Sequence, residues 1–285
     1  MESAKCIICN SKNSFNLIEE VSDRFNPRNK YKIQKCVCGM VMLNPRPDSN
    51  EISKYYKDEN YHPQNRSTIF FDRFYKLAQT INNRIKYKTI SKYFSSGNTL
   101  DYGSGDGQFQ NHMSEKGWDA DIYEPYLKSD TMKRKIINDT SKIKDNYYNV
   151  ITMFHSLEHI HEINEALEKI NISLIHNGIL MIAVPNYDAY ERKFFKKRWI
   201  AYDAPRHLYH FNSTSIKRIL EQNNFKIIES RPMYLDTFYN ILMSADNKLI
   251  FFMKIIYLSL TSFYNIYRDN NQCSSMMLVC KKNES

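Results

Sequence analysis

The sequence predicts an α/β fold built on a largely parallel β-sheet, with a small cysteine-bearing module ahead of it. Short apolar runs alternate with helical segments from residue 98 to residue 228, which is typical of parallel strands joined by helices. Three of the chain's seven glycines occupy alternate positions of one turn, at Gly103, Gly105 and Gly107. Four of the six cysteines precede residue 39. Together these observations predict a sheet domain with a ligand loop after its first strand, and a separate N-terminal unit.

Length and composition narrow the class of protein. A chain of 285 residues forms one large domain, alone or with a small appendage. Its formal net charge of +9 favours anionic partners in general terms, but the lysines are scattered, so we predict no nucleic-acid binding. The first residues contain no apolar signal region, from which we expect a cytoplasmic protein. In a reducing compartment the six cysteines do not indicate a disulfide scaffold.

The N-terminal unit, residues 1–48, carries two cysteine pairs, Cys6 with Cys9 and Cys36 with Cys38. Two such pairs suggest a zinc-ribbon-like module, in which a structural Zn²⁺ ion replaces the core that so small a unit cannot build. The second pair has one intervening residue where zinc ribbons usually have two, and free buried thiols are the alternative. Cys280, far from this unit, is expected to be a core residue of the last strand.

The rest of the chain divides into a helical lead-in, residues 49–94, and a sheet domain, residues 95–285. Apolar residues recur at helical spacing over residues 68–94. The predicted strands are Asn98–Asp101, Ala120–Tyr123, Lys133–Asn138, Asn149–Phe154, Ile179–Val184, Phe225–Ile228 and Ser275–Cys280. The predicted helices are Gln108–Lys116, Asn164–Ile175 and Ile216–Gln222, and a turn is predicted at His176–Gly178.

The turn between Leu100 and Gly107 predicts a ligand site. A strand, a glycine turn and a helix direct backbone N–H groups and a helix N-terminus at a ligand, although a generic tight turn has the same composition. Glu124 ends the next strand about 20 residues on, where a carboxylate grips the ribose of a bound nucleotide in related folds. A solvated charge at a strand end is the alternative for Glu124.

Several strings resemble class I S-adenosylmethionine (SAM)-dependent methyltransferases. They are Asp101 with the three glycines, His155–His159, and Pro185–Asn186. With the N-terminal cysteines and Asp203–Phe211, the chain resembles a bacterial subgroup often associated with surface-glycan pathways. The resemblance implies a Rossmann-like, seven-stranded methyltransferase sheet. Its last strand is antiparallel. The segment before that strand, residues 233–272, is longer than a hairpin requires and has an apolar centre, so we expect a helical insertion there.

The resemblance also implies which residues hold SAM. Gly103 and Gly105 would pass under the methionine half of the cofactor, and Asp101 would hold its amino end. Glu124 would bind the ribose, and Asp139 the adenine amino group, with a turn-forming aspartate as the alternative for Asp139. His155 would lie beside the methionine moiety or the transferable methyl group.

Three side chains are candidates for catalysis. His155 ends the fourth strand, at the sheet edge where ligands bind, and either acts as a general base or only lines the pocket. Arg206 and His207 belong to a loop rich in basic and aromatic residues, 187–211, which suits a polar or phosphorylated substrate. The alternative is a structural loop in which Arg206 pairs with Asp203.

The sequence therefore predicts a SAM-dependent enzyme that O-methylates a sugar or another small metabolite of glycan biosynthesis, free or lipid-linked. A quinone or lipid-like acceptor, and a non-catalytic zinc-ribbon binding protein, are the alternatives. Residues 249–260 are apolar, but Lys254 interrupts them, so we expect no membrane span. We expect instead an amphipathic helix within residues 246–267 that caps the substrate site, forms a dimer or touches lipid.

Overall fold

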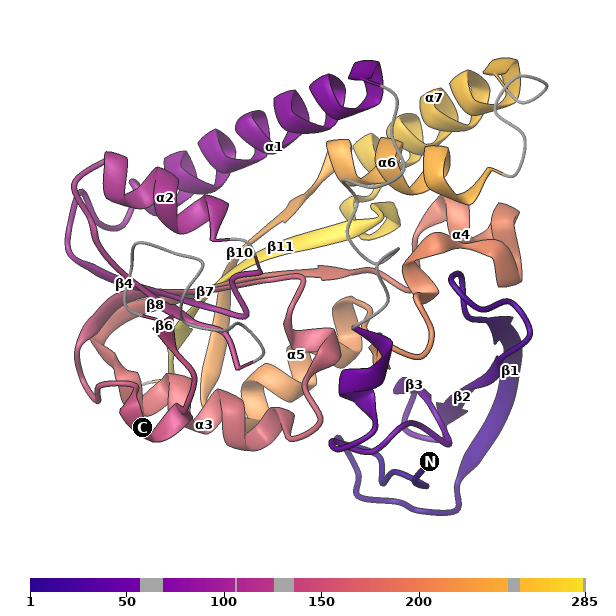
Figure 1. Ribbon diagram of the computed structural model, residues 1–285, viewed down its shortest axis with the longest axis horizontal. Coiled ribbons are helices and arrows are strands. Elements are labelled where there is room, and N and C mark those ends of the chain that lie inside the picture. The colour runs from indigo at the N-terminus through magenta and orange to yellow at the C-terminus, as the bar shows by residue number, and fades with distance from the viewer. Residues whose placement is uncertain (57–68, 106, 126–135, 246–251, 284–285) are drawn as a thin grey trace.

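The computed structural model describes residues 1–56, 69–105, 107–125, 136–245 and 252–283 (Figure 1). Its main sheet has the strand order β10-β11-β8-β7-β4-β5-β6. Strand β11 runs antiparallel to both of its neighbours, and the pairs from β8 to β6 are parallel. This arrangement confirms the predicted seven-stranded α/β fold. The strands are β4 (Asn98–Tyr102), β5 (Asp119–Tyr123), β6 (Ile136–Ile137), β7 (Tyr148–Phe154), β8 (Leu174–Pro185), β10 (Phe225–Pro232) and β11 (Ser275–Lys282).

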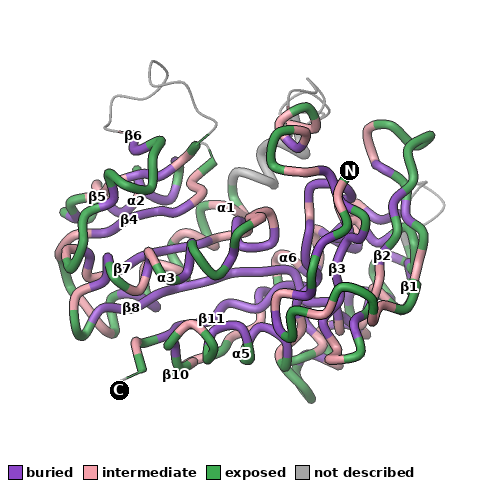
Figure 2. The backbone as a smooth tube through the Cα atoms, turned by 90° about the horizontal axis from the view of Figure 1, so that it is seen from below, coloured by how far each residue is buried: buried purple, intermediate pink, exposed green. Residues whose placement is uncertain are grey.

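The main sheet is covered by helices on both faces, since consecutive side chains of a strand point to opposite sides. In β8, Leu180 and Ile182 belong to one hydrophobic core, and Ile179 and Met181 belong to the other. The first core includes α3 (Ile163–Ser173) and α5 (Ser213–Gln222), and the second includes α2 (Gln108–Glu115) and the end of α1 (Ile69–Ile90) (Figure 1). The central strands are accordingly the most deeply buried part of the chain (Figure 2).

Two predicted elements differ from the structure. The turn predicted at His176–Gly178 lies inside β8, where the register against β7 jumps from Tyr148↔Leu174 to Val150↔Ile179. The additional residues on β8 form a bulge. They include Asn177 and Gly178, which are typical turn residues, and this is why the sequence predicts a turn here. The predicted strand Lys133–Asn138 is reduced to Ile136–Ile137, and its first three residues lie outside the described part of the chain.

The N-terminal unit forms a second sheet that the catalytic region completes. Its strands are β1 (Phe15–Ser22), β2 (Lys30–Cys36) and β3 (Val41–Leu43), and β3 pairs with β9 (Tyr209–His210). Arg46, just after β3, donates hydrogen bonds to Glu2 (2.7 Å) and to the Tyr209 hydroxyl (2.6 Å). Both sheets contribute to one continuous core. The unit predicted for residues 1–48 is therefore packed as part of the larger domain.

The insertion before the last strand is helical, as predicted. It contains α6 (Tyr234–Ser244) and α7 (Phe252–Arg268), which pack on each other through Tyr234 and Phe263; residues 246–251 lie outside the described part. A shorter helix, α4 (Tyr190–Phe195), follows β8. In the part of the chain that the structure describes, no helix has the length and apolarity needed to cross a membrane.

Candidate functional site

A cavity of about 390 Å³ opens at the carboxyl edge of the main sheet, beside the glycine turn. Each part of the chain supplies some of its wall. Arg24 comes from the N-terminal unit, Lys86 from α1, His155 from the end of β7 and Asp236 from the insertion. This edge is where open α/β sheets bind their ligands, so the cavity is the candidate functional site.

The glycine turn is shaped by one close backbone approach. Gly103 has a φ of +80°, and a Cβ atom at this position would lie 2.5 Å from the Cβ of Ser156. Its N–H donates to the carbonyl of Tyr123 (2.8 Å), and the Ser156 hydroxyl donates to the carbonyl of Tyr102 (2.8 Å). Only glycine fits this position, because a side chain would be strained and would displace the strand-end loop of β7.

The outer part of the turn faces open space. Gly105 has a φ of +56°, and a Cβ atom built on it would meet no atom within 4 Å. The Ser104 hydroxyl is buried and has no hydrogen-bond partner among the described residues. The carboxylate of Glu124 accepts a hydrogen bond from the Gly105 N–H (3.1 Å). The turn therefore holds the predicted cofactor residues Gly105 and Glu124 together and presents a polar atom that a ligand can satisfy.

Asp101 and Asp139 lie in different surroundings. Asp101 is buried, lines the cavity and accepts a hydrogen bond from the Thr152 hydroxyl (2.6 Å). Asp139 is exposed, and its carboxylate caps a short 3₁₀ turn by accepting from the Ser141 N–H (2.9 Å). This backbone hydrogen bond lowers the pKa of Asp139. In the structure Asp139 therefore caps a turn, whereas Asp101 faces the ligand cavity, and the adenine contact of Asp139 stays a prediction.

His155 projects into the cavity from a strained position, with a φ of +53°. Its Nε2 lies 3.0 Å from Asp236, which also accepts from the Asn82 amide (3.3 Å), and its Nδ1 lies 3.6 Å from Glu158. Burial opposes the charged form, but the two carboxylates outweigh it and raise the pKa of His155 to about 9. At neutral pH the ring is therefore a charged donor to Asp236, and it has no lone pair with which to act as a base.

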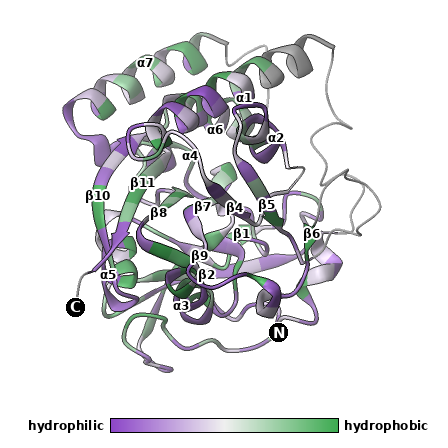
Figure 3. Cartoon of the chain, turned by 90° about the vertical axis from the view of Figure 1, so that its left-hand side faces the viewer, coloured by the Kyte–Doolittle hydropathy of each residue, from purple (hydrophilic) through white to green (hydrophobic). Residues whose placement is uncertain are grey.

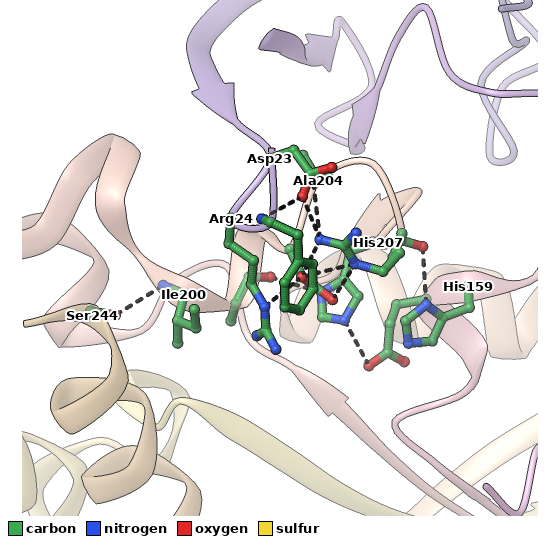
Figure 4. A network of polar contacts seen from close by, with 12 residues as sticks. Asp23, Arg24, His159, Ile200, Ala204, His207 and Ser244 are labelled. Carbon is green, nitrogen blue, oxygen red and sulfur yellow. Dashed lines mark hydrogen bonds and ion pairs between the residues drawn. The ribbon is translucent and has the colours of Figure 1, made fainter. Parts of the chain in front are cut away.

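Arg206 does not line the cavity. Its side chain is 1 % exposed, and its guanidinium donates to Asp23 (3.0 Å) and to Asp203 (2.9 Å). Figure 4 shows the loop residues Asp23 and Arg24 gathered around Ala204 and His207. Although burial opposes ionisation of Asp203, the charge of Arg206 lowers the pKa of this carboxyl to about 2. The structure therefore shows the alternative in which Arg206 pairs with Asp203, with Asp23 as an additional partner.

His207 does line the cavity, and its ring lies beside His159 with the centroids 4.7 Å apart. Its Nδ1 donates to the carbonyl of Ala201 (2.8 Å). His159 is held by the carbonyl of Arg206 (3.0 Å) and the Tyr56 hydroxyl (3.0 Å). Burial lowers the pKa of His159 to about 4, so its ring is neutral. The ring of His159 is thus held by a backbone carbonyl and by a tyrosine hydroxyl.

The four N-terminal cysteines converge. The Sγ atoms of Cys6 and Cys38 lie 3.4 Å apart, as do those of Cys9 and Cys36, and all four lie within 4.8 Å of one another. Tetrahedral thiolates around zinc are separated by about 3.8 Å, given a Zn–S bond of about 2.3 Å. A backbone hydrogen bond from Ser11 lowers the pKa of Cys9 to about 7. Burial raises the pKa of Cys6 and of Cys36, so it is the convergence of the four sulfur atoms that suits a metal ion.

Several residues of the wall were missed by sequence reasoning. Arg24, Asn82, Lys86 and Asp236 belong to no motif, and each reaches the cavity from a segment far from the glycine turn. Lys86 is the least expected of them, because its Nζ lies 3.9 Å from the centre of the Phe154 ring and burial lowers its pKa. Its place on a helical lead-in offered no signal in the sequence.

Comparisons with known proteins agree with this geometry. A family model described as a methyltransferase domain matches residues 71–230, more than half of the chain. The chain belongs to this family. No curated protein sequence matches it. The matched region of this methyltransferase-domain protein contains the glycine turn, Glu124 and His155, which are the residues on which the predicted methyltransferase resemblance depends.

Two solved structures share the fold of this methyltransferase-domain protein. One is the Burkholderia thailandensis 1,6-didemethyltoxoflavin-N1-methyltransferase with bound 1,6-didemethyltoxoflavin and S-adenosylhomocysteine: 12% identity, TM-score 0.51, covering 86% of this chain and 96% of that chain. The other is the Haemonchus contortus phosphoethanolamine N-methyltransferase 2 in complex with SAM: 14% identity, TM-score 0.52, covering 95% of this chain and 69% of that chain. The protein is therefore a methyltransferase with the fold of SAM-dependent enzymes.

The buried Arg206 ion pairs predict a large loss of stability on truncation. Arg206→Ala leaves Asp23 buried without its cation and Asp203 with only the longer contact to Arg24 (3.6 Å), so we expect the free energy of unfolding to fall by about 3–5 kcal/mol. Urea denaturation followed by circular dichroism measures the change. Lys217→Ala is the control, because Lys217 pairs with Glu221 on the surface and such pairs contribute at most about 1 kcal/mol. Equal losses in both variants would contradict a structural role for Arg206.

Proposed function

We propose that this protein transfers the methyl group of SAM to a hydroxyl oxygen of a sugar or another small metabolite of glycan biosynthesis. The observation that carries the proposal is the wall of the cavity beside the glycine turn. It is lined by charged and amide side chains, among them Arg24, Asn82, Asn83, Asp203 and Asp236. Such a wall suits an acceptor with several hydroxyl or phosphate groups, because each buried polar group of the wall then finds a partner.

The residues of the glycine turn fit SAM. The Ser104 hydroxyl, which has no hydrogen-bond partner among the described residues, and the open space at Gly105 supply a donor and room for a ligand against the backbone. Asp101, at the cavity wall, would hold the amino group, and Glu124 would hold the ribose. SAM supplies a methyl group on a positively charged sulfur, and the protein's contribution is to hold the acceptor oxygen in line with it.

The predicted catalytic residues would take different roles. His155 and His207 line the cavity, and His155, held charged between Asp236 and Glu158, would donate a hydrogen bond to the acceptor. Arg206 would act as a positioning residue, because it fixes Asp203 and the loop that carries His207. Lys86 and Arg24 add positive charge to the same wall, which favours an acceptor that carries phosphate.

SAM binding tests the cofactor half of the proposal. Glu124→Gln removes a charged acceptor from the turn, so we expect the Kd for SAM, measured by calorimetry, to rise at least tenfold, equivalent to about 1.4 kcal/mol. Glu115→Gln is the matched control, since Glu115 is an exposed acid at the end of the helix that the turn begins. Equal affinities for SAM in both variants would exclude Glu124 from the cofactor site.

A transfer assay tests the acceptor half. We expect wild-type protein to move a labelled methyl group to one or more nucleotide sugars or lipid-linked saccharides, with His155→Gln lowering kcat while the Kd for SAM stays unchanged. If the methyl group is transferred only to quinones, the acceptor is a lipid-like compound and the proposed sugar acceptor is wrong. Tight SAM binding without transfer to any of these compounds would contradict the proposed substrate class.

We also propose that the four N-terminal cysteines bind a structural zinc ion. The fit rests on their converging sulfur atoms and on the position of the second pair at a turn, where the Cys36 N–H donates to the carbonyl of Met40 (2.8 Å). A C-x-C pair can serve because Cys36 ends β2 and Cys38 follows in the turn, and the sulfur atoms of both lie within 4.8 Å of those of Cys6 and Cys9. The ion would hold the loop of Cys6–Cys9 on the edge of the N-terminal sheet.

Zinc binding predicts a loss of both metal and stability in a cysteine variant. Cys9→Ser should remove one equivalent of zinc, measured by inductively coupled plasma mass spectrometry, and lower the thermal unfolding midpoint, because the metal's binding energy contributes to folding. Cys273→Ser is the control, since Cys273 is buried outside this cluster. An unchanged zinc content in Cys9→Ser would show that these thiols do not bind the metal.

We propose, finally, that α7 contacts a lipid surface. Its exposed side includes Met253, Tyr257, Leu260, Tyr264 and Tyr267, spaced by four and three residues along one face, while Ile255, Leu258 and Ile266 are buried on the other. Figure 3 shows α7 at the periphery of the molecule, with hydrophobic positions along it. An exposed apolar face of this kind, on a basic protein, suits an anionic membrane surface and a lipid-linked acceptor.

Flotation with phosphatidylcholine–phosphatidylglycerol vesicles tests the lipid contact. The double substitution Tyr257→Glu and Leu260→Glu puts two negative charges on the exposed face, so we expect at least a tenfold lower bound fraction than for wild type. Ile172→Glu is the matched control, because Ile172 is an exposed apolar residue on α3. Equal flotation of the double variant and wild type would show that α7 does not contact the lipid surface.

A further inference from the structure

Glu158 is a buried carboxylate that makes no hydrogen bond to the described residues. Its side chain is 0 % exposed, and neither Oε1 nor Oε2 has a hydrogen-bond partner within the described ranges of the chain. The nearest imidazole nitrogens lie beyond hydrogen-bond distance, at 3.6 Å for His155 Nδ1 and 4.0 Å for His207 Nε2. Burying a carboxylate costs free energy unless it is hydrogen-bonded, paired with a cation or bound to a metal. A bound cation would therefore stabilise Glu158.

Two imidazoles converge on the same carboxylate. Carbonyl oxygens can only accept, so the contacts to Ala201 and Arg206 place the hydrogen of His207 and of His159 on Nδ1. This leaves Nε2 as the atom that each ring can offer. One ligand atom from each of Glu158, His159 and His207 lies within 4.8 Å of the others, and Figure 4 shows the His159 and His207 rings side by side.

The neighbouring carboxylates already have cations. Asp23 and Asp203 share Arg206, Asp203 also lies 3.6 Å from Arg24, and Asp236 lies 3.0 Å from His155. Glu158 is buried close to His155 and His207, and among the described residues its charge is met only at longer range. The Nε2 lone pair of His207, 4.0 Å from Oε1 of Glu158, repels the carboxylate unless a proton or a metal ion lies between them.

We propose that Glu158, His159 and His207 bind a divalent transition metal ion, of the class represented by Zn²⁺ and Co²⁺. Two imidazole nitrogens and one carboxylate form a ligand set that such ions take while keeping open positions. The Nδ1–H···O=C contacts are the supports that orient metal-ligating histidines. Ligand atoms around such an ion lie roughly 3.0–3.5 Å apart, a separation that the 4.0 Å between His207 Nε2 and Glu158 Oε1 approaches.

The position of this site gives the metal a role in acceptor binding. His207 lines the cavity, so open coordination positions on the ion would face the space where the acceptor lies. Resting on the proposed function, this narrows the acceptor to a compound with a hydroxyl, carboxylate or phosphate oxygen near the methylated position, held by the metal. The ion is separate from the cysteine cluster in both ligand type and location.

Metal counting tests the proposal without any enzyme assay. Full-length protein is loaded with excess Zn²⁺, desalted and analysed for metal by mass spectrometry. We expect two equivalents per chain for wild type, one each for Glu158→Gln, His207→Gln and Cys9→Ser, and two for His176→Gln, an exposed histidine outside the cluster. If wild type binds one equivalent of zinc and Cys9→Ser binds none, the proposal is overturned, whatever the zinc content of Glu158→Gln and His207→Gln.

Cobalt distinguishes the two sites by spectrum. Co²⁺ added to protein that already carries one equivalent of zinc should give weak visible bands without thiolate-to-cobalt charge transfer, and these bands should be absent from Glu158→Gln and His207→Gln. Unfolding midpoints within experimental error of wild type show that both variants are folded; if one is not, the other decides. Bands that persist in a folded variant overturn the proposal. Failure of SAM binding or methyl transfer would leave the metal count unchanged, so the two failures are distinguishable.

Discussion

The ion-pair cluster around Arg206 holds the functional half of the molecule in place. A guanidinium can be this deeply buried only if its lost hydration is replaced, and here Asp23 and Asp203 replace it. Asp23 follows β1 in the N-terminal sheet, whereas Asp203 and Arg206 belong to the loop after α4. The pair therefore fixes the N-terminal unit against the catalytic loop, and this contact determines where the residues next to it point.

Two of those neighbours line the cavity. Arg24 follows Asp23 in the sequence, and His207 follows Arg206. The ion pair that buries Asp23 and Arg206 therefore also positions Arg24 and His207 at the ligand site. The strand pairing of β3 with β9 reinforces this arrangement two residues further along the loop. A cysteine-bearing unit that looks separate in the sequence thus contributes to the site both by a side chain and by holding the loop that carries His207.

Local features of the sequence predicted the sheet and the turn well, because they depend on short-range physics. The glycine at 103 is required by a contact with Ser156, but its position after a strand is visible without that contact, and the antiparallel last strand follows from the family resemblance. The bulge in β8 could not be predicted, since Asn177 and Gly178 have the same composition as a turn. Only the pairing with β7, which lies elsewhere in the chain, decides between the two.

The site was predicted less completely, because its chemistry depends on contacts between distant segments. The sequence placed His155 at the strand end, but its charge depends on Asp236, 81 positions away. The pairing of Arg206 with Asp203 could be proposed from their spacing of three residues, whereas Asp23 could not. Glu158 lies between a predicted catalytic histidine and a structural one, and only its complete burial distinguishes it. The sequence alone shows Glu158 as one acid within a motif. Its burial and its lack of a close cation among the described residues, which only the structure shows, are what indicate a metal site.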